Sequence, residues 1–135
     1  MRSSIASALL LIFLTGCYTG GLFTGNEQLL KETASAYYNM LMWKYYDRAS
    51  VYVEEDKKGY FEKFAQESKD NLNITSYELR EVVFDPNAKK GLVRVAVNYY
   101  KYPSVSEKTV LLEDPWILKG GKWYNDSDFK DGIFK

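Results

Sequence analysis

The chain is 135 residues long, the length of one domain, and its 18 basic and 18 acidic residues give a formal net charge of 0. It contains no histidine, which excludes Ser-His-Asp and Cys-His catalysis, histidine acid–base chemistry and the usual zinc sites. A balanced charge without a basic block argues against a nucleic-acid partner, and we expect no cofactor and no metal.

The chain opens on a short apolar run that ends at Leu14-Thr15-Gly16-Cys17, and this segment holds the only cysteine. The run is shorter than the ~20 residues that a membrane-spanning helix needs, and it fits the apolar core of a signal peptide. The segment resembles the lipobox of bacterial lipoproteins. This resemblance implies that residues 1–16 are a removed signal peptide. It also implies that acylated Cys17 holds the protein on membrane lipid in the bacterial cell envelope.

Residues 17–25 are rich in glycine and threonine and have no apolar period, which predicts a flexible tether of about 15 Å. Tyr18 follows the cysteine. In enteric bacterial lipoproteins an aspartate at this position favours retention in the inner membrane. The resemblance therefore favours the outer membrane, facing the periplasm, if the organism has one.

Three helices are expected next, over residues 27–46, 47–53 and 57–70. The first carries apolar residues at the spacing of one helix face: Leu30, Ala34, Tyr37, Leu41 and Tyr45. Its apolar arc is wide, which favours packing inside a concave sheet, and a tyrosine-lined ligand site is the alternative. The acidic triplet at 54–56 is interpreted as a solvated loop rather than as a pair of catalytic carboxylates, because two lysines follow it directly.

From Ile74 the apolar period changes to two, which predicts strands over 74–84, 92–102, 107–119 and 122–126. The third strand is expected to be interrupted at Asp114-Pro115, since proline needs a bulge or an edge position. Gly120-Gly121 is a signal for a tight two-residue turn. The tail after residue 128 is expected to be partly loose.

This order predicts an α+β fold in which three N-terminal helices pack in a curved antiparallel sheet of about four strands. The chain resembles the NTF2-like (cystatin-like cone) superfamily in its Trp-rich end, residues 116–124, and in the aromatic first helix that runs into Tyr45-Tyr46-Asp47. The expected domain covers 26–128, with a tail at 129–135. The resemblance implies a cone-shaped cavity, for which the candidate lining residues are Tyr37, Tyr38, Trp43, Phe61, Phe64, Trp116 and Trp123.

Catalysis is not expected. Ketosteroid isomerases, which belong to the same superfamily, place a tyrosine on the first helix and need a carboxylate in the cavity. Tyr37 or Tyr38 could supply the tyrosine, but no carboxylate is assigned to an inward position beside it. A calcium loop is rejected as well, because Asp126-Ser127-Asp128 continues with Lys130 and Asp131 where an EF-hand needs an oxygen ligand and a glycine.

Two hypotheses of different classes remain. The first is a non-catalytic protein-interaction module that binds an envelope protein or a second copy of itself. Strand parity supplies its candidate surface, the outward positions Arg94, Asn98, Tyr100 and Tyr102. The alternative is a protein that binds a small apolar ligand in the cone. Bulky aromatic side chains that fill the cone favour the first hypothesis, whereas an open apolar cavity would favour the second.

Overall fold

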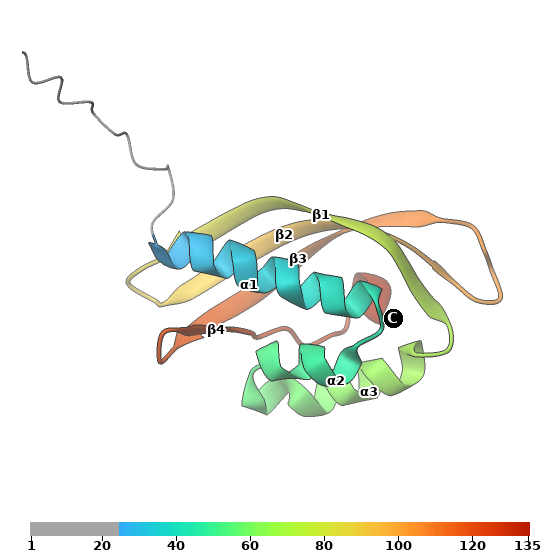
Figure 1. Cartoon of the computed structure of the whole chain (residues 1–135), viewed down its shortest axis with the longest axis horizontal. Coiled ribbons are helices and arrows are strands. Elements are labelled where there is room, and N and C mark those ends of the chain that lie inside the picture. The colour runs from blue at the N-terminus through green and yellow to red at the C-terminus, as the bar shows by residue number, and fades with distance from the viewer. Residues whose placement is uncertain (1–24) are drawn as a thin grey trace, which may run out of the picture.

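The computed structural model describes residues 25–135 (Figure 1). The predicted leader, Cys17 and almost all of the predicted tether lie outside these residues. Among the residues described, no helix is long and apolar enough to cross a membrane. The helices come first, followed by the strands: α1 Gly25–Met42, α2 Tyr46–Ala49, α3 Lys58–Ser68, β1 Leu72–Asp85, β2 Lys90–Lys101, β3 Lys108–Lys119 and β4 Lys122–Asn125.

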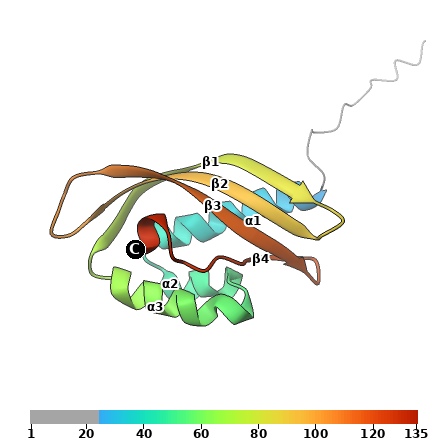
Figure 2. The same cartoon turned by 180° about the vertical axis from the view of Figure 1, so that it is seen from behind.

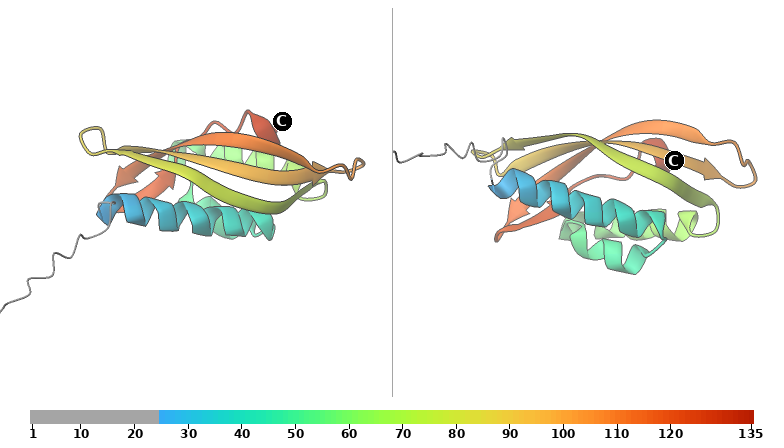
Figure 3. Two further views of the ribbon diagram at one scale, coloured as in Figure 1. Left: turned by 90° about the horizontal axis from the view of Figure 1, so that it is seen from above. Right: turned by 45° about the horizontal axis from the view of Figure 1, so that its top comes forward.

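The four strands form one antiparallel sheet in the order β1-β2-β3-β4. The helices all lie on one side of this curved sheet, and its other face is left bare (Figures 1 and 2). α1 runs along the concave side beneath β1 and β2, while α2 and α3 form a lower layer (Figure 3). The predicted α+β class, with helices before a curved four-stranded sheet, is therefore confirmed.

α1 buries four of the five residues of the predicted stripe, with Tyr38 added to them, but the helix ends before the fifth, Tyr45. It stops at Met42, and Lys44 adopts a φ of 60° and donates its N–H to the Leu41 carbonyl. This turn separates α1 from α2 and leaves Trp43 and Tyr45 exposed. The first helix therefore ends four residues before the expected end at 46, and the expected second helix over 47–53 is α2 followed by a 3₁₀ turn at Ser50–Tyr52.

The alternation predicted for the second strand is confirmed, because Val93, Val95 and Val97 are fully buried against the helices. β1 pairs with β2 through two register shifts, whereas β2 and β3 pair over ten positions without one. β3 is continuous through Pro115, contrary to the expected interruption. Proline is tolerated there because β4 pairs only with the last four residues of β3, so Pro115 lies beyond the end of β4.

The segment after β4 is not a loose tail. We call residues 126–134 the C-terminal strap. It returns beneath β3 and ends in a short 3₁₀ turn (Figure 2). Phe129 and Ile133 are buried in the core, and Phe129 packs on Phe61 and Phe64 with ring centroids 5.3 and 6.2 Å apart. The strap thus belongs to the domain, and the expected boundary at residue 128 is wrong.

The Glu54 side chain corrects a second expectation, that the acidic triplet is fully solvated. Glu54 is buried and forms an ion pair with Lys119. Glu55 and Asp56 are exposed, as expected. Val53 bridges to Asn125, which brings Glu54 under the end of β3.

A valine at Gly121 is expected to destabilise the domain by about 1–3 kcal/mol, because Gly120 and Gly121 have φ values of 57° and 75° that β-branched residues adopt only under strain. Urea denaturation of the purified domain measures the loss. Gly59→Val is a matched control for bulk, since nothing lies within 4 Å of its Cβ position. An unchanged unfolding midpoint for Gly121→Val would contradict this role of the turn.

Candidate functional site

Six of the seven candidate cavity residues lie in the core, where each is almost fully buried: Tyr37, Tyr38, Phe61, Phe64, Trp116 and Trp123. Trp43 does not lie with them, since its side chain is 61% exposed. Its assignment to the interior is wrong because α1 ends one residue before it.

Aromatic rings fill the space between α1 and the sheet. Tyr37 packs edge-on against Tyr38 and against Trp116, with centroids 5.1 and 5.6 Å apart. Trp123 packs edge-on against Phe84, and its indole N–H donates to the Asn26 carbonyl at 3.0 Å. The two tryptophans therefore have separate aromatic partners on the same inner face. The interior predicted to be a cone-shaped cavity is largely filled by these side chains.

One carboxyl lies inside this aromatic core. Asp114 projects inward from β3 with only 2% of its surface exposed. Its Oδ2 accepts hydrogen bonds from the Tyr38 hydroxyl and, at 3.3 Å, from Asn125 Nδ2. Burial raises the pKa of Asp114 to about 6, and the hydrogen bonds from Tyr38 and Asn125 oppose that rise. Burial and the nearby Asp114 carboxylate raise the pKa of both Tyr37 and Tyr38 well above the ordinary value.

Two buried donors belong to the same neighbourhood. Within the described part of the chain, the Tyr37 hydroxyl and the Trp116 indole N–H have no hydrogen-bond partner. An unpaired buried donor costs ~1–3 kcal/mol, so this pair is an unusual feature of the core. A carboxyl with a pKa near 6 beside phenol and indole donors could exchange a proton or hold a small polar group. Burial closes these groups off from a substrate in the present arrangement.

The sequence-based expectation that no carboxylate faces inward beside Tyr37 or Tyr38 is therefore wrong. The signal was present in the alternation Leu112, Asp114, Trp116, whose positions all face inward. A strand interrupted at Asp114-Pro115 does not carry the inward and outward alternation through these residues, so the inward position of Asp114 is not predicted.

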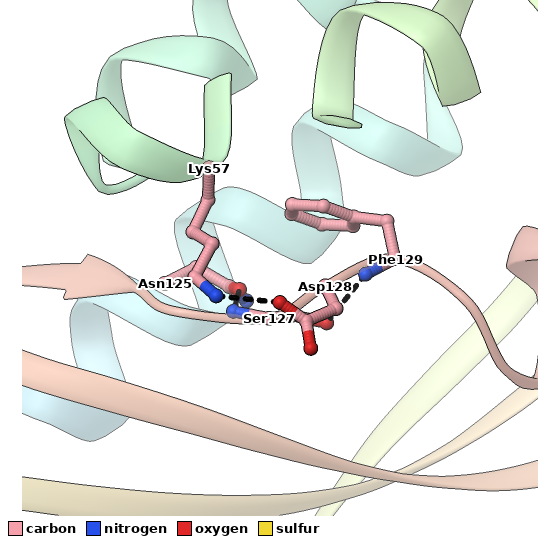
Figure 4. A network of polar contacts seen from close by, with 5 residues as sticks. All are labelled: Lys57, Asn125, Ser127, Asp128 and Phe129. Carbon is pink, nitrogen blue, oxygen red and sulfur yellow. Dashed lines mark hydrogen bonds and ion pairs between the residues drawn. The ribbon is translucent and has the colours of Figure 1, made fainter. Parts of the chain in front are cut away.

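Asn125, which donates to Asp114, also bonds to the strap, and Figure 4 shows its contacts on the strap side. Its Oδ1 accepts the Ser127 N–H at 2.9 Å, and the Ser127 hydroxyl oxygen accepts the Phe129 N–H at 3.1 Å. Asp128 forms an ion pair with Lys57, which lies just before α3, and this contact holds the strap from the other side. These contacts fix the strap at one end of a groove of about 530 Å³ that separates it from Val110–Pro115 of β3.

The predicted outer surface lies on the bare face of the sheet, but its polar side chains already have partners. Arg94 bonds to Glu81 on β1 and to Glu113 on β3. Asn98 donates to Ser76 at 2.8 Å and accepts from Thr109 at 2.6 Å. At the end of the strand, Tyr100 and Tyr102 pack edge-on 5.4 Å apart, and Tyr102 is 51% exposed. The residues expected to form an interface thus lie on one face within a fixed polar network.

Among residues 25–135, no three Asp, Glu or Cys side chains gather in a group that could hold a metal ion. The Asp126-Ser127-Asp128 segment serves as the start of the strap, with Asp128 paired to Lys57.

The arrangement of helices and curved sheet is that of the NTF2-like fold. Among solved structures, the chain is similar to a ketosteroid isomerase-like protein from Erwinia carotovora atroseptica SCRI1043, with a TM-score of 0.63 and 13% identity over 76% of this chain and 92% of that one. It is also similar to a SEC-C motif-containing protein from Rhodopseudomonas palustris, with a TM-score of 0.57 and 12% identity over 73% of each chain. No protein-family model and no curated protein sequence matches the chain. Identities this low show a common fold and nothing about activity.

Proposed function

We propose that this chain is a lipid-anchored, non-catalytic interaction module of the bacterial envelope, and that it binds partners through the outer face of its sheet. The filled interior is the observation that carries the proposal. Tyr37 packs on Tyr38 and Trp116 in the space between α1 and the sheet, all three are buried, and Asp114 is almost fully covered. Because the helices and strap cover the concave side, the other face of the sheet is the broad surface left for a partner (Figure 3). Acylated Cys17 would hold this module at the membrane, as the resemblance to a lipobox implies.

The polar network on the outer face supports this role. Arg94 is held in place by two carboxylates, and Tyr100 is held by Tyr102. A surface whose side chains are already ordered loses less conformational entropy on binding. Tyrosine and arginine are enriched among the residues that dominate binding energy at interfaces. Leu111, which is 56% exposed on the neighbouring strand, adds an apolar contact. The partner is another envelope protein or a second copy of this chain.

The double variant Tyr100→Asp with Arg94→Glu tests the outer face. Residues 17–135 with Cys17→Ser, which include the whole described fold, are expected to self-associate or to retain a co-purifying partner. The double variant is expected to weaken that association by about tenfold or more, since it removes two interface anchors of ~1.4 kcal/mol or more in total. Analytical ultracentrifugation measures self-association, and far-UV circular dichroism checks the fold.

Tyr60→Asp with Lys63→Glu makes the same change in charge on the exposed side of α3 and is the matched control. It is expected to leave association unchanged. A wild-type domain that stays monomeric at high concentration and retains no envelope partner would contradict the proposal, and so would equal losses in both double variants.

The second candidate function is binding of a small, mainly apolar ligand in the cone. The unpaired Tyr37 hydroxyl and Trp116 N–H beside Asp114 favour it, because together they could hold one polar group of such a ligand. The solved structure of a ketosteroid isomerase-like protein shares the fold. Native mass spectrometry of the protein purified from its own host distinguishes the two functions, since a retained small-molecule mass would support the ligand and a retained protein mass the interaction module.

A further inference from the structure

The free edge of β3 is the feature that extends the proposed function. β4 pairs with Trp116–Lys119 alone, so the first eight residues of β3 have β2 as their only strand partner within the described chain. β1 is also an edge strand, but two register shifts and the charged side chains of Glu78, Arg80 and Glu81 interrupt it. Such bulges and charges protect an edge against pairing. β3 has no register shift from Lys108 to Ile117, so its edge lacks the bulges of β1 and is protected only near its middle, by Glu113 and Pro115.

The direction of the unpaired groups follows from one hydrogen bond. Asp126 donates its N–H to the Pro115 carbonyl at 2.8 Å, which places the Pro115 carbonyl on the side of β4. Backbone groups alternate between the two sides of a strand, so Leu111 and Glu113 direct their N–H and C=O to that same side. Neither residue's backbone has a partner there among the described residues. The backbone N–H and C=O groups of Leu111 and Glu113 are therefore free to pair with an added strand.

A groove lies along this edge. Val110–Pro115 form one wall and the strap forms the other, and the groove measures about 530 Å³. The strap diverges from β3 after Asp126 and crosses beneath it at Gly132, where an added Cβ would lie 2.5 Å from Leu112 Cδ2. The groove thus lies beside Leu111 and Glu113, between β3 and the strap.

The charge of the groove indicates its occupant. Its lining contains five acidic residues and one basic residue, Lys130, with the acids at Glu113, Asp114, Asp126, Asp128 and Asp131. Arg94 and Lys57 hold Glu113 and Asp128 in ion pairs. Asp126 forms no close ion pair among the described residues, although its charge acts on Lys57 and Lys119, and the exposed Asp131 contacts Lys135 only at 3.9 Å. These two carboxylates are left to attract a cation. A second copy of this acidic edge would meet like charge, which disfavours self-pairing here.

We propose that the β3 edge binds an extended, lysine- or arginine-bearing segment of a partner protein, which adds to the sheet as a further strand beside Leu111 and Glu113. Main-chain hydrogen bonds supply the affinity in this mode, and the side chains at alternate positions supply the specificity. The partner's identity as an envelope protein rests on the proposed function. The binding mode itself needs neither the lipid anchor nor the outer face.

The probe is the acetylated, amidated peptide Lys-Val-Lys-Val-Lys-Val, added to ¹⁵N-labelled residues 17–135 with Cys17→Ser. We expect amide shifts centred on Leu111, Glu113 and Asp126, with a Kd below about 1 mM at low salt. Binding should weaken several-fold at about 0.5 M salt, because screening removes the attraction of Asp126 and Asp131. The same peptide with glutamate in place of lysine is expected to cause no shifts.

Leu111→Pro is the decisive variant, since it removes the edge N–H that the intramolecular sheet does not use. It is expected to weaken the peptide by about tenfold or more, whereas Leu111→Thr, which keeps the N–H, should change the Kd by less than about threefold. Hydrogen exchange on the wild type gives a second readout that needs no variant. The Leu111 and Glu113 amides should exchange fast, Leu112 and Asp114 slowly, and the first pair should slow when the peptide binds.

Absence of shifts at millimolar peptide, shifts elsewhere, or equal binding by Leu111→Pro in a folded chain would each overturn the proposal. Concentration-dependent shifts of Leu111 and Glu113 without peptide would assign the edge to a second copy instead. Because the peptide experiment does not involve Tyr100 or the acyl chain, its failure leaves the proposed function standing, and failure of the outer-face variant leaves the edge standing.

Discussion

Asparagine at position 114 is expected to raise the free energy of unfolding at about pH 8 by about 3 kcal/mol. The Asp114 carboxyl has a pKa of about 6 in the fold, against an ordinary value of 3.8. A pKa that is raised on folding favours the protonated group, so its contribution to stability is complete below the ordinary value and is lost as the pH rises through about 6. The difference of about two pKa units corresponds to about 3 kcal/mol. Asparagine is neutral and of the same size, and it can still accept the hydrogen bonds from Tyr38 and Asn125.

Urea denaturation of the wild type and of Asp114→Asn at about pH 8 and at about pH 3.5 measures this effect. The two chains should be close in stability at the acidic pH, where both groups are neutral. Asp128, whose pKa is held below its ordinary value by Lys57, gives the opposite pH dependence in both chains and cancels from the difference. Asp70→Asn, an exposed change of the same charge, is the control. A difference that does not vary with pH would contradict the burial of an ionisable carboxyl at Asp114.

Alanine at Cys17 is expected to move the mature protein from the membrane fraction to the soluble fraction and to remove the mass of the acyl chains. Each buried methylene of an acyl chain contributes ~0.8 kcal/mol, and more than one chain gives stable anchoring. To separate anchoring from leader processing, the variant is exported with an unrelated cleavable secretory leader and is compared with Tyr18→Ala, which keeps the cysteine.

Detergent phase partition and intact mass spectrometry of the two variants give the readout. Tyr18→Ala behind the native leader should partition with the detergent and carry the acyl mass. Processed Cys17→Ala should remain in the aqueous phase without it. Membrane association of the processed Cys17→Ala chain would show that something other than this cysteine anchors the protein.

The sequence predicts the fold best where apolar residues keep a single spacing over a whole segment. Val93, Val95 and Val97 alternate along β2, so the sequence predicts both the face that packs on the helices and the outward direction of Arg94 and Asn98. The glycine pair at 120–121 likewise predicted the turn, because positive φ at two successive positions demands that residue type.

The errors arose where one residue contradicted its neighbours. Proline normally breaks a strand, so the sequence predicts an interruption at Pro115 and assigns no inward position to Asp114. The sequence does not predict the strap because its three apolar residues, Phe129, Ile133 and Phe134, stand among aspartates and lysines and are too few to establish a helical or strand period. Such a segment packs through single anchors on a surface formed by distant parts of the chain, here Phe61 and Phe64. A contact with such distant residues leaves no periodic pattern in the sequence of the strap itself.

Because Asn125 contacts both Asp114 and the strap, the protonation of Asp114 and the docking of the strap are coupled. The amide bonds to Asp114 through its nitrogen and to the strap through its oxygen, and the strap forms a wall of the groove that Asp114 also lines. The hydrogen bond from Asn125 favours the charged form of Asp114, and the strap holds the same amide through Ser127. Reciprocity then requires that ionisation of Asp114 strengthen the docking of the strap by as much free energy as the strap, acting through this amide, contributes to lowering the pKa. Protonation of Asp114 below about pH 6 therefore removes this support from the strap and from the wall of the β3 groove that it forms.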